Sequence, residues 1–391
     1  MTKSKIFEFL QIPATIIGIC TIITILFFVF TKINIPTFQK TNVQTPTAAY
    51  TQEEVPELKE ILGPIQKIRL EAARKLVERV GVEQALEILE HSDLPHTGEG
   101  HLVVHQVGFY AYQHYGLESI LHCKDYFLQA CYHGAIIEAA SKGGFDEIAK
   151  MADTCKPGGP VRYFQCNHAA GHAILAIWNY DLESSLKTCD DLFEKETSTY
   201  PEALTSCHNG AFMENLFGVH DWGTEKSPKL DWISDKDPYF PCNAFDGKYQ
   251  KGCWLNQAAR IYQMEGGDIV KTARLCEQIK NNQYVTWCID NLARQIHALT
   301  NGQAQQVFNM CSAIGQYWKE NCIVINAGSF YSVGDFKTSL SICQQIAPIA
   351  QNQCFEQLKS QIVGDNVESK IKKDRCSQIG GNYAKNCLSQ I

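Results

Sequence analysis

The spacing of the cysteines is the feature that most constrains what this chain can fold into. Sixteen cysteines, from Cys123 to Cys387, can be taken as eight consecutive pairs, and six of these pairs are separated by 11 or 12 residues. The first members advance by 32 to 35 residues at every step except one of 53. That period is typical of helix-turn-helix repeats, which stack into solenoids. The sequence therefore predicts an all-α fold, an α-solenoid with a disulfide in each repeat.

The residues between the cysteines support this repeat. Asp181, Asp268 and Asp335 each stand eight residues before the first cysteine of a pair, where a helix N-cap is expected. Glycine directly precedes Asp268 and Asp335, which is a signal for one helix to end and another to begin. A disulfide from the end of one helix to the start of the next closes a loop of about a dozen residues and stabilises the fold by roughly 3 kcal/mol.

The cysteine content also indicates the compartment. The chain has 17 cysteines and no Cys-x-x-Cys pair, which excludes zinc-ribbon, ferredoxin and c-type haem motifs and favours disulfides in an oxidising environment. Residues 9–31 carry no charge and are long enough to cross a bilayer as an uncleaved signal anchor. We therefore expect a single-pass membrane protein with a cytoplasmic N-terminus and the rest of the chain in the periplasm or at the cell surface.

The predicted organisation has five parts. The expected segments are a cytoplasmic N-terminus (1–8), a transmembrane anchor (9–31), a flexible linker rich in Thr, Gln and Pro (32–56), His-rich helical repeats (57–241) and C-terminal disulfide-stapled repeats (242–391). The long step in the cysteine period is an insertion at 217–241 that is rich in aromatic residues. Such a loop is either an ordered surface loop that packs its own aromatics or a lid over a site.

Histidines cluster in the first repeats. Counted from the second cysteine of each pair, His168 and His172 lie at +2 and +6 and so share one face of a helix, and His133 also lies at +2. His101 and His105 reproduce this spacing if Glu99 stands in the cysteine position. Second helices of successive repeats lie side by side, so equivalent positions should meet. The predicted metal ligands are His101, His105, His133, His168, His172 and His208.

Two glutamates could provide acid–base chemistry beside the metal. Glu138 and Glu214 are both at +7 from a second cysteine, on a neighbouring stripe, and are the candidate catalytic residues. The expected cofactor is a divalent transition metal, either zinc, iron, manganese or copper, because nitrogen and oxygen ligands do not separate these ions. A site of this kind is compatible with a hydrolase or an oxidase.

Alternative interpretations stay open. The histidines could be structural, or they could line a groove of a non-catalytic scaffold that binds a peptide, protein, small molecule or envelope component. The histidines disappear from the equivalent positions after Cys253 while the cysteine repeat continues, which favours a role beyond structure. A net charge of −7, with no basic stripe, excludes nucleic acid as an expected partner.

The repeat period and the hairpin pattern from about residue 60 to residue 391 resemble the tetratricopeptide and Sel1-like α-solenoids. In particular, the pattern resembles that of secreted Sel1-like proteins whose repeats are each stapled by a disulfide. The tetratricopeptide Trp-Leu-Gly-Tyr framework and the Sel1 Gly-x-x-Tyr-x-x-Gly pattern are both missing. Four short segments carry the clustered histidines: His101 with His105, His133, His168 with His172, and His208. Together they resemble an uncharacterised family of anchored prokaryotic proteins, a resemblance that implies no function.

Overall fold

A computed structural model describes residues 50–391, apart from residues 97, 125, 219–230 and 366. The predicted cytoplasmic segment (1–8), the predicted anchor (9–31) and most of the predicted linker (32–56) lie outside the described residues. Within the part that is described, no helix has the length and apolar character needed to cross a membrane.

Every regular element in the described part of the chain is helical, as the sequence predicts. The α-helices are α2 (Leu58–Ile61), α3 (Gln66–Val80), α4 (Val82–Glu90), α5 (Gly98–Tyr115), α6 (Ser119–His122), α7 (Ala130–Cys155), α8 (Gly159–Ile177), α9 (Leu182–Phe193), α10 (Ala203–Phe217), α11 (Gln250–Met264), α12 (Ile269–Glu277), α13 (Asn282–Leu299), α14 (Ala304–Ala313), α15 (Gln316–Ser332), α16 (Phe336–Gln345), α17 (Pro348–Gly364), α18 (Ser369–Ile379) and α19 (Gly381–Leu388).

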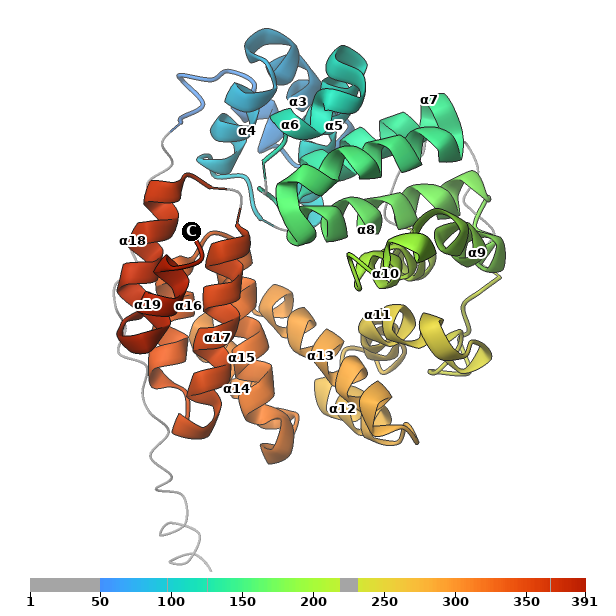
Figure 1. Ribbon diagram of the computed structural model, residues 1–391, viewed down its shortest axis with the longest axis vertical. Helices are drawn as coiled ribbons and strands as arrows, with labels where there is room; N and C mark the ends of the chain where they lie inside the picture. Colours follow the sequence, from blue (N-terminus) through green and yellow to red (C-terminus); the bar gives the residue numbers. More distant parts are fainter. Residues whose placement is uncertain (1–49, 97, 125, 219–230, 366) are drawn as a thin grey trace, which may run out of the picture. The chain divides into compact units, whose positions relative to one another are not determined.

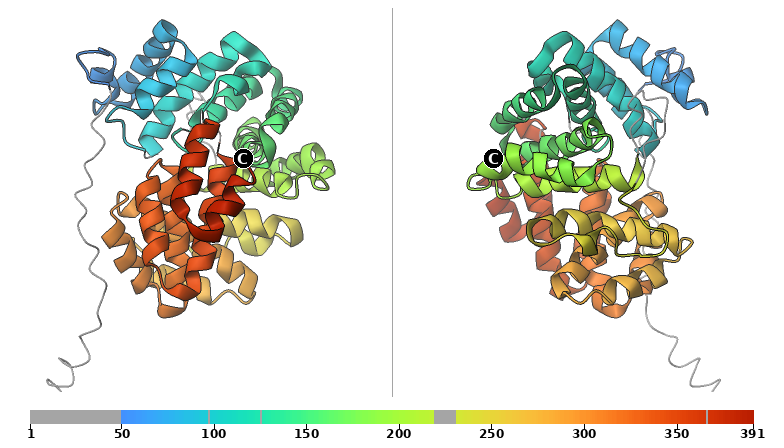
Figure 2. Two further views of the ribbon diagram at one scale, coloured as in Figure 1. Left: turned by 60° about the vertical axis from the view of Figure 1, so that its left-hand side comes forward. Right: turned by 90° about the vertical axis from the view of Figure 1, so that its right-hand side faces the viewer.

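The second helices of successive hairpins pack against one another in chain order. The series α5, α7, α8, α10, α11, α13, α15, α17 and α19 runs through the described chain with each helix in contact with the next (Figure 1). The first helices of the hairpins, such as α9, α12, α14 and α16, lie against this series, and the two views in Figure 2 agree with that arrangement. Helix pairs stacked in this way form an α-solenoid.

The eight disulfides join the cysteines in the consecutive pairs that the sequence predicts. They are Cys123–Cys131, Cys155–Cys166, Cys189–Cys207, Cys242–Cys253, Cys276–Cys288, Cys311–Cys322, Cys343–Cys354 and Cys376–Cys387. Disulfides in this number form and persist in an oxidising, extracytoplasmic environment.

Local signals set the ends of the helices. The predicted N-caps are confirmed, because the carboxylates of Asp181, Asp268 and Asp335 accept hydrogen bonds from backbone N–H groups of the following turn. Helix α7 contains the second helix of one hairpin and the first helix of the next. These are separated by a break at Gly144, whose φ of 61° suits a residue without a Cβ.

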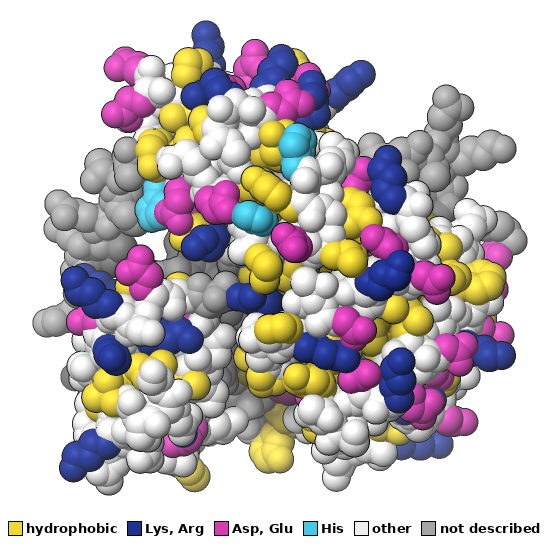
Figure 3. Space-filling view, turned by 45° about the horizontal axis from the view of Figure 1, so that its top comes forward, with side chains coloured by type: hydrophobic (Ala, Val, Ile, Leu, Met, Phe, Trp, Pro, Cys, Tyr) yellow, Lys and Arg dark blue, Asp and Glu magenta, His cyan; other side chains and the backbone are white. Residues whose placement is uncertain are grey.

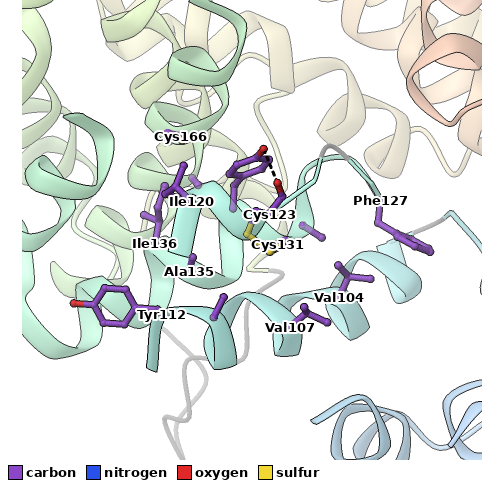
Figure 4. Close-up of a cluster of buried hydrophobic side chains, with 14 of the residues drawn as sticks. Val104, Val107, Tyr112, Ile120, Cys123, Phe127, Cys131, Ala135, Ile136 and Cys166 are labelled. Atoms are coloured by element: carbon purple, nitrogen blue, oxygen red, sulfur yellow. Dashed lines mark hydrogen bonds between the residues drawn. A yellow bond between two sulfur atoms is a disulfide. The ribbon is translucent and has the colours of Figure 1, made fainter. Parts of the chain in front are cut away.

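The disulfides are part of the hydrophobic core. Figure 4 shows Cys123 and Cys131 bonded beside Val104 and Val107 of α5, all of them buried. The Tyr132 hydroxyl, also buried, donates a hydrogen bond to the carbonyl oxygen of Cys123 at 3.2 Å. Each repeat therefore combines a covalent link with apolar burial. The surface is mixed in charge: on the face shown in Figure 3, basic and acidic side chains alternate among apolar ones.

The end of the predicted insertion, residues 231–241, packs against the solenoid. The ring of Trp232 stacks on Phe240 and contacts Phe245, with ring centroids 5.9 and 5.3 Å apart. The backbone carbonyl of Trp232 accepts a hydrogen bond from Asn215 of α10 at 2.8 Å. This part of the insertion is an ordered loop that packs its own aromatics. Residues 219–230 lie outside the described residues.

Candidate metal centre

Glycine contacts bring the helices of the centre unusually close together. A Cβ on Gly108 of α5 would lie 2.2 Å from the carbonyl oxygen of Cys131 in α7, and a Cβ on Gly134 would lie 2.2 Å from that of His105. The same pair of contacts recurs two hairpins later, where Gly171 of α8 faces Cys207 and Gly210 of α10 faces His168. Only glycine permits such backbone contact. The helices are therefore close enough for short polar side chains to meet.

Three histidines from two helices converge at the first of these crossings. His101 and His105 lie one turn apart on α5, and His133 comes from α7. One nitrogen from each ring lies within 4.8 Å of the other two. His101 Nε2 and His133 Nδ1 are 3.1 Å apart. For metal–nitrogen bonds of about 2.0–2.1 Å, two ligands of a tetrahedral ion are separated by about 3.3 Å. The three rings therefore fit a metal ion.

The backbone before α7 orients the ring of His101. The Nδ1 of His101 lies 2.7 Å from the carbonyl oxygen of Phe127, to which it donates, so Nε2 is the nitrogen that carries the lone pair toward the cluster. Phe127, Leu128 and Gln129 have φ values of 50°, 55° and 62°. Three consecutive non-glycine residues in the left-handed region cost about 1–2 kcal/mol each. Strain of this size is characteristic of functional sites.

A second pair of histidines lies beside the first three rings. His168 and His172 on α8 place their Nε2 atoms 3.1 Å apart. The Nδ1 of His172 lies 3.0 Å from Glu214 Oε2 on α10, and the Tyr180 hydroxyl donates to Glu214 Oε1 at 2.6 Å. His172 and Glu214 are both fully buried. Tyr180 has a φ of 66° and follows Asn179 with a φ of 50°, so a second strained segment supports this pair.

His133 lies between the two groups of histidines. Its ring centroid is 4.9 Å from that of His101 on one side, and 5.5 and 5.6 Å from those of His168 and His172 on the other. Burial, and then the neighbouring imidazoles, hold the pKa of His133 well below its ordinary value. The ring is therefore neutral at pH 7, which is the form that binds metals. His133 of α7 thus lies next to the histidines of both α5 and α8.

The other candidate residues lie elsewhere. The Nε2 of His208 on α10 lies 2.9 Å from Asp190 Oδ1, and Asp190 also accepts a hydrogen bond from the Tyr249 hydroxyl and pairs with Lys248. Glu138 accepts a hydrogen bond from the Gln113 amide at 3.0 Å. The structure thus brings five of the six predicted ligands and Glu214 together, whereas the contacts of His208 and Glu138 are with other residues.

The histidines of α5 are shifted by one helical turn from the repeat positions that the sequence predicts for them. The glycine contacts make His105, three residues before Gly108, the counterpart of His168, three residues before Gly171. The expectation that His101 and His105 match His168 and His172 is therefore wrong. The shared His-x-x-Gly spacing was the signal available in the sequence. No sequence signal pointed to Tyr180 or to the Phe127 carbonyl, which reach the centre through irregular backbone.

No family model, no curated protein and no solved structure matches this chain.

Proposed function

We propose that this protein is an extracytoplasmic metalloprotein, anchored to a membrane through residues 9–31, in which His101, His105 and His133 bind a divalent transition-metal ion. The observation that carries the proposal is the convergence of three imidazole nitrogens from two helices within 4.8 Å of one another. The left-handed segment that fixes His101 supports it, because no other run of three consecutive non-glycine residues has such φ values in the part of the chain that the structure describes.

The donor set favours particular ions and a particular chemistry. Imidazole suits zinc, copper and iron, whereas manganese prefers carboxylates, so zinc is our first choice among the four candidate ions. Three protein ligands on a tetrahedral zinc ion leave a fourth position for water, which is the pattern of catalytic rather than structural zinc sites. A metal-bound water loses a proton near pH 7 and becomes a nucleophile. We therefore propose hydrolysis as the reaction class; copper or iron would support oxidation.

The glutamates have a different role in this proposal from the one first expected. Glu214 accepts from His172 and Tyr180 and is buried, so it orients the ring of His172 beside the proposed metal site. Glu138 is engaged with Gln113. The metal-bound water itself, and not a carboxylate, would supply the reacting oxygen.

Metal analysis of the full-length chain, purified with its disulfides intact, tests the proposal. We expect bound zinc, its removal by a chelator, and a rise in thermal stability when Zn²⁺ is restored, because an ion that binds only the folded state stabilises it by about 2.7 kcal/mol at 100 times its Kd. The double variant His101→Ala/His105→Ala should lose this response. His114→Ala is the matched control, since His114 is exposed on the same helix.

Two results would contradict the proposal. One is a chain that binds no transition metal and shows no stability change with zinc, copper or iron. The other is a double variant that binds metal as the control does. Either result would favour the non-catalytic scaffold that binds a peptide, protein or envelope component.

A further inference from the structure

The pair His168 and His172 has the geometry of a second metal chelate. The two residues are four apart on α8, so their rings project from one face, and their Nε2 atoms lie 3.1 Å apart. That separation is close to the distance of about 3.3 Å expected between two nitrogens bound to one tetrahedral ion. It equals the 3.1 Å between the nitrogens of His101 and His133 in the first group.

The partners of His172 determine which of its ring nitrogens carries the lone pair that faces His168. Since Glu214 accepts at Nδ1, the proton lies on that nitrogen and the lone pair lies on Nε2, the atom that faces His168. A carboxylate that holds the far nitrogen of a ligating histidine is the usual arrangement around protein metals. Tyr180 in turn holds the second oxygen of Glu214. A buried chain of three groups, ending in the strained segment at Asn179 and Tyr180, therefore fixes one ring.

We propose that His168 and His172 bind a second divalent metal ion next to the first, so that the five histidines form a two-ion centre with the His133 ring between the two ions. Glu214 is a positioning residue for the second ion. This inference rests on the proposed metal site at His101, His105 and His133. It deepens that function, because a second ion would add a second Lewis acid to the same site.

The test is the stoichiometry of Zn²⁺ binding to the full-length apoprotein, measured by titration against a chromophoric chelator and by elemental analysis. We expect two equivalents for the unaltered chain. We expect one equivalent for His168→Asn/His172→Asn and one for His101→Asn/His105→Asn, because each variant keeps the other group. His114→Asn is the control and should bind two. Circular dichroism establishes that each variant is folded.

The outcomes separate the two proposals. One equivalent in the unaltered chain, retained by His168→Asn/His172→Asn, overturns the second site and leaves the first. One equivalent that is lost in both double variants shows a single ion shared by all five rings and also overturns the second site. No bound zinc in any form overturns the proposed function itself. The count for the unaltered chain decides the question even where a double variant fails to fold.

Discussion

Replacement of Gly171 by alanine should test one of the close helix contacts of the centre. A Cβ at this position would lie 2.0 Å from the backbone oxygen of Cys207 and 2.7 Å from the backbone nitrogen of Ala211. Ordinary contact begins near 3.4 Å, so α8 and α10 must separate by about 1.4 Å at this point. Backbone atoms on both sides prevent a side-chain rotation from relieving the clash.

This displacement has two consequences of measurable size. Overpacking of this kind costs about 1–3 kcal/mol, and the better helix propensity of alanine recovers about 1 kcal/mol. The free energy of unfolding should therefore fall by up to about 2 kcal/mol. The bond between His172 and Glu214 joins the same two helices at 3.0 Å and would be stretched beyond hydrogen-bonding range. Since ligands must be held within about 0.5 Å, zinc affinity should fall at least about tenfold.

The assay is denaturant unfolding with the disulfides intact, together with zinc titration. Gly98→Ala is the matched control, because a Cβ on Gly98 in α5 meets nothing within 4 Å. The control should change stability by less than about 0.5 kcal/mol and leave zinc binding unaltered. If Gly171→Ala matches the control in both measurements, the glycine crossing does not position the histidines and the geometric argument fails.

Three further substitutions probe separate features. Glu214→Gln removes the charge beside His172 and should weaken zinc binding about 10–100-fold with no gain in stability, measured by chelator competition; unaltered affinity would contradict the positioning role. Burial, and then the charge of Glu87, raise the pKa of Glu90 to about 8, so the folded state binds a proton more tightly than the unfolded chain and loses stability as pH rises from about 5 to 8. Glu90→Gln should flatten this dependence and add roughly 2–4 kcal/mol at pH 8 in denaturant unfolding, whereas the exposed Glu118→Gln should leave the slope unchanged. Leu128→Gly removes the left-handed penalty at an exposed position and should raise the unfolding free energy by about 0.5–1 kcal/mol; a loss of stability would contradict the strain at that residue.

The sequence predicted the structure best where the spacing of residues repeats along the chain. The disulfide pairs and the caps at Asp268 and Asp335 depend on local spacing alone, so they could be predicted without knowledge of the packing. The convergence of His133 with His168 and His172 depends on neighbouring second helices, which the repeat frame also predicts. Helical periodicity thus accounts for most of the centre.

Predictions failed where a position depends on tertiary contacts. Glu138 occupies the same repeat position as Glu214, yet Gln113 lies within hydrogen-bonding distance of it. His208, one residue after Cys207, lies within hydrogen-bonding distance of Asp190. Tyr180 lies in a left-handed turn, and nothing in its local sequence specifies that its hydroxyl points toward Glu214. A repeat frame specifies which face a residue occupies, but not which neighbour it meets there.

The C-terminal repeats show which polar contacts join the second helices where the histidine cluster is missing. Asn256 and Asn291 stand three residues after a second cysteine, as Gly134 and Gly210 do, and Asn326 stands one residue further along; all three are buried and bind backbone across neighbouring helices. Asn256 donates to the carbonyl oxygen of Asn209 at 3.0 Å, Asn291 accepts from the N–H of Ala259 at 3.0 Å, and Asn326 donates to the carbonyl oxygen of Ala293 at 2.9 Å.

Each of these side chains makes a hydrogen bond to the main chain of a neighbouring helix, which is a structural role. The ring nitrogens of His101 and His133, and those of His168 and His172, instead lie opposite one another at 3.1 Å. A scaffold that already has a polar residue for helix contacts does not require that arrangement, whereas a metal ion does. The loss of the histidines from the second helices after Cys253, while the disulfides continue, is therefore the strongest reason to seek function in the first repeats.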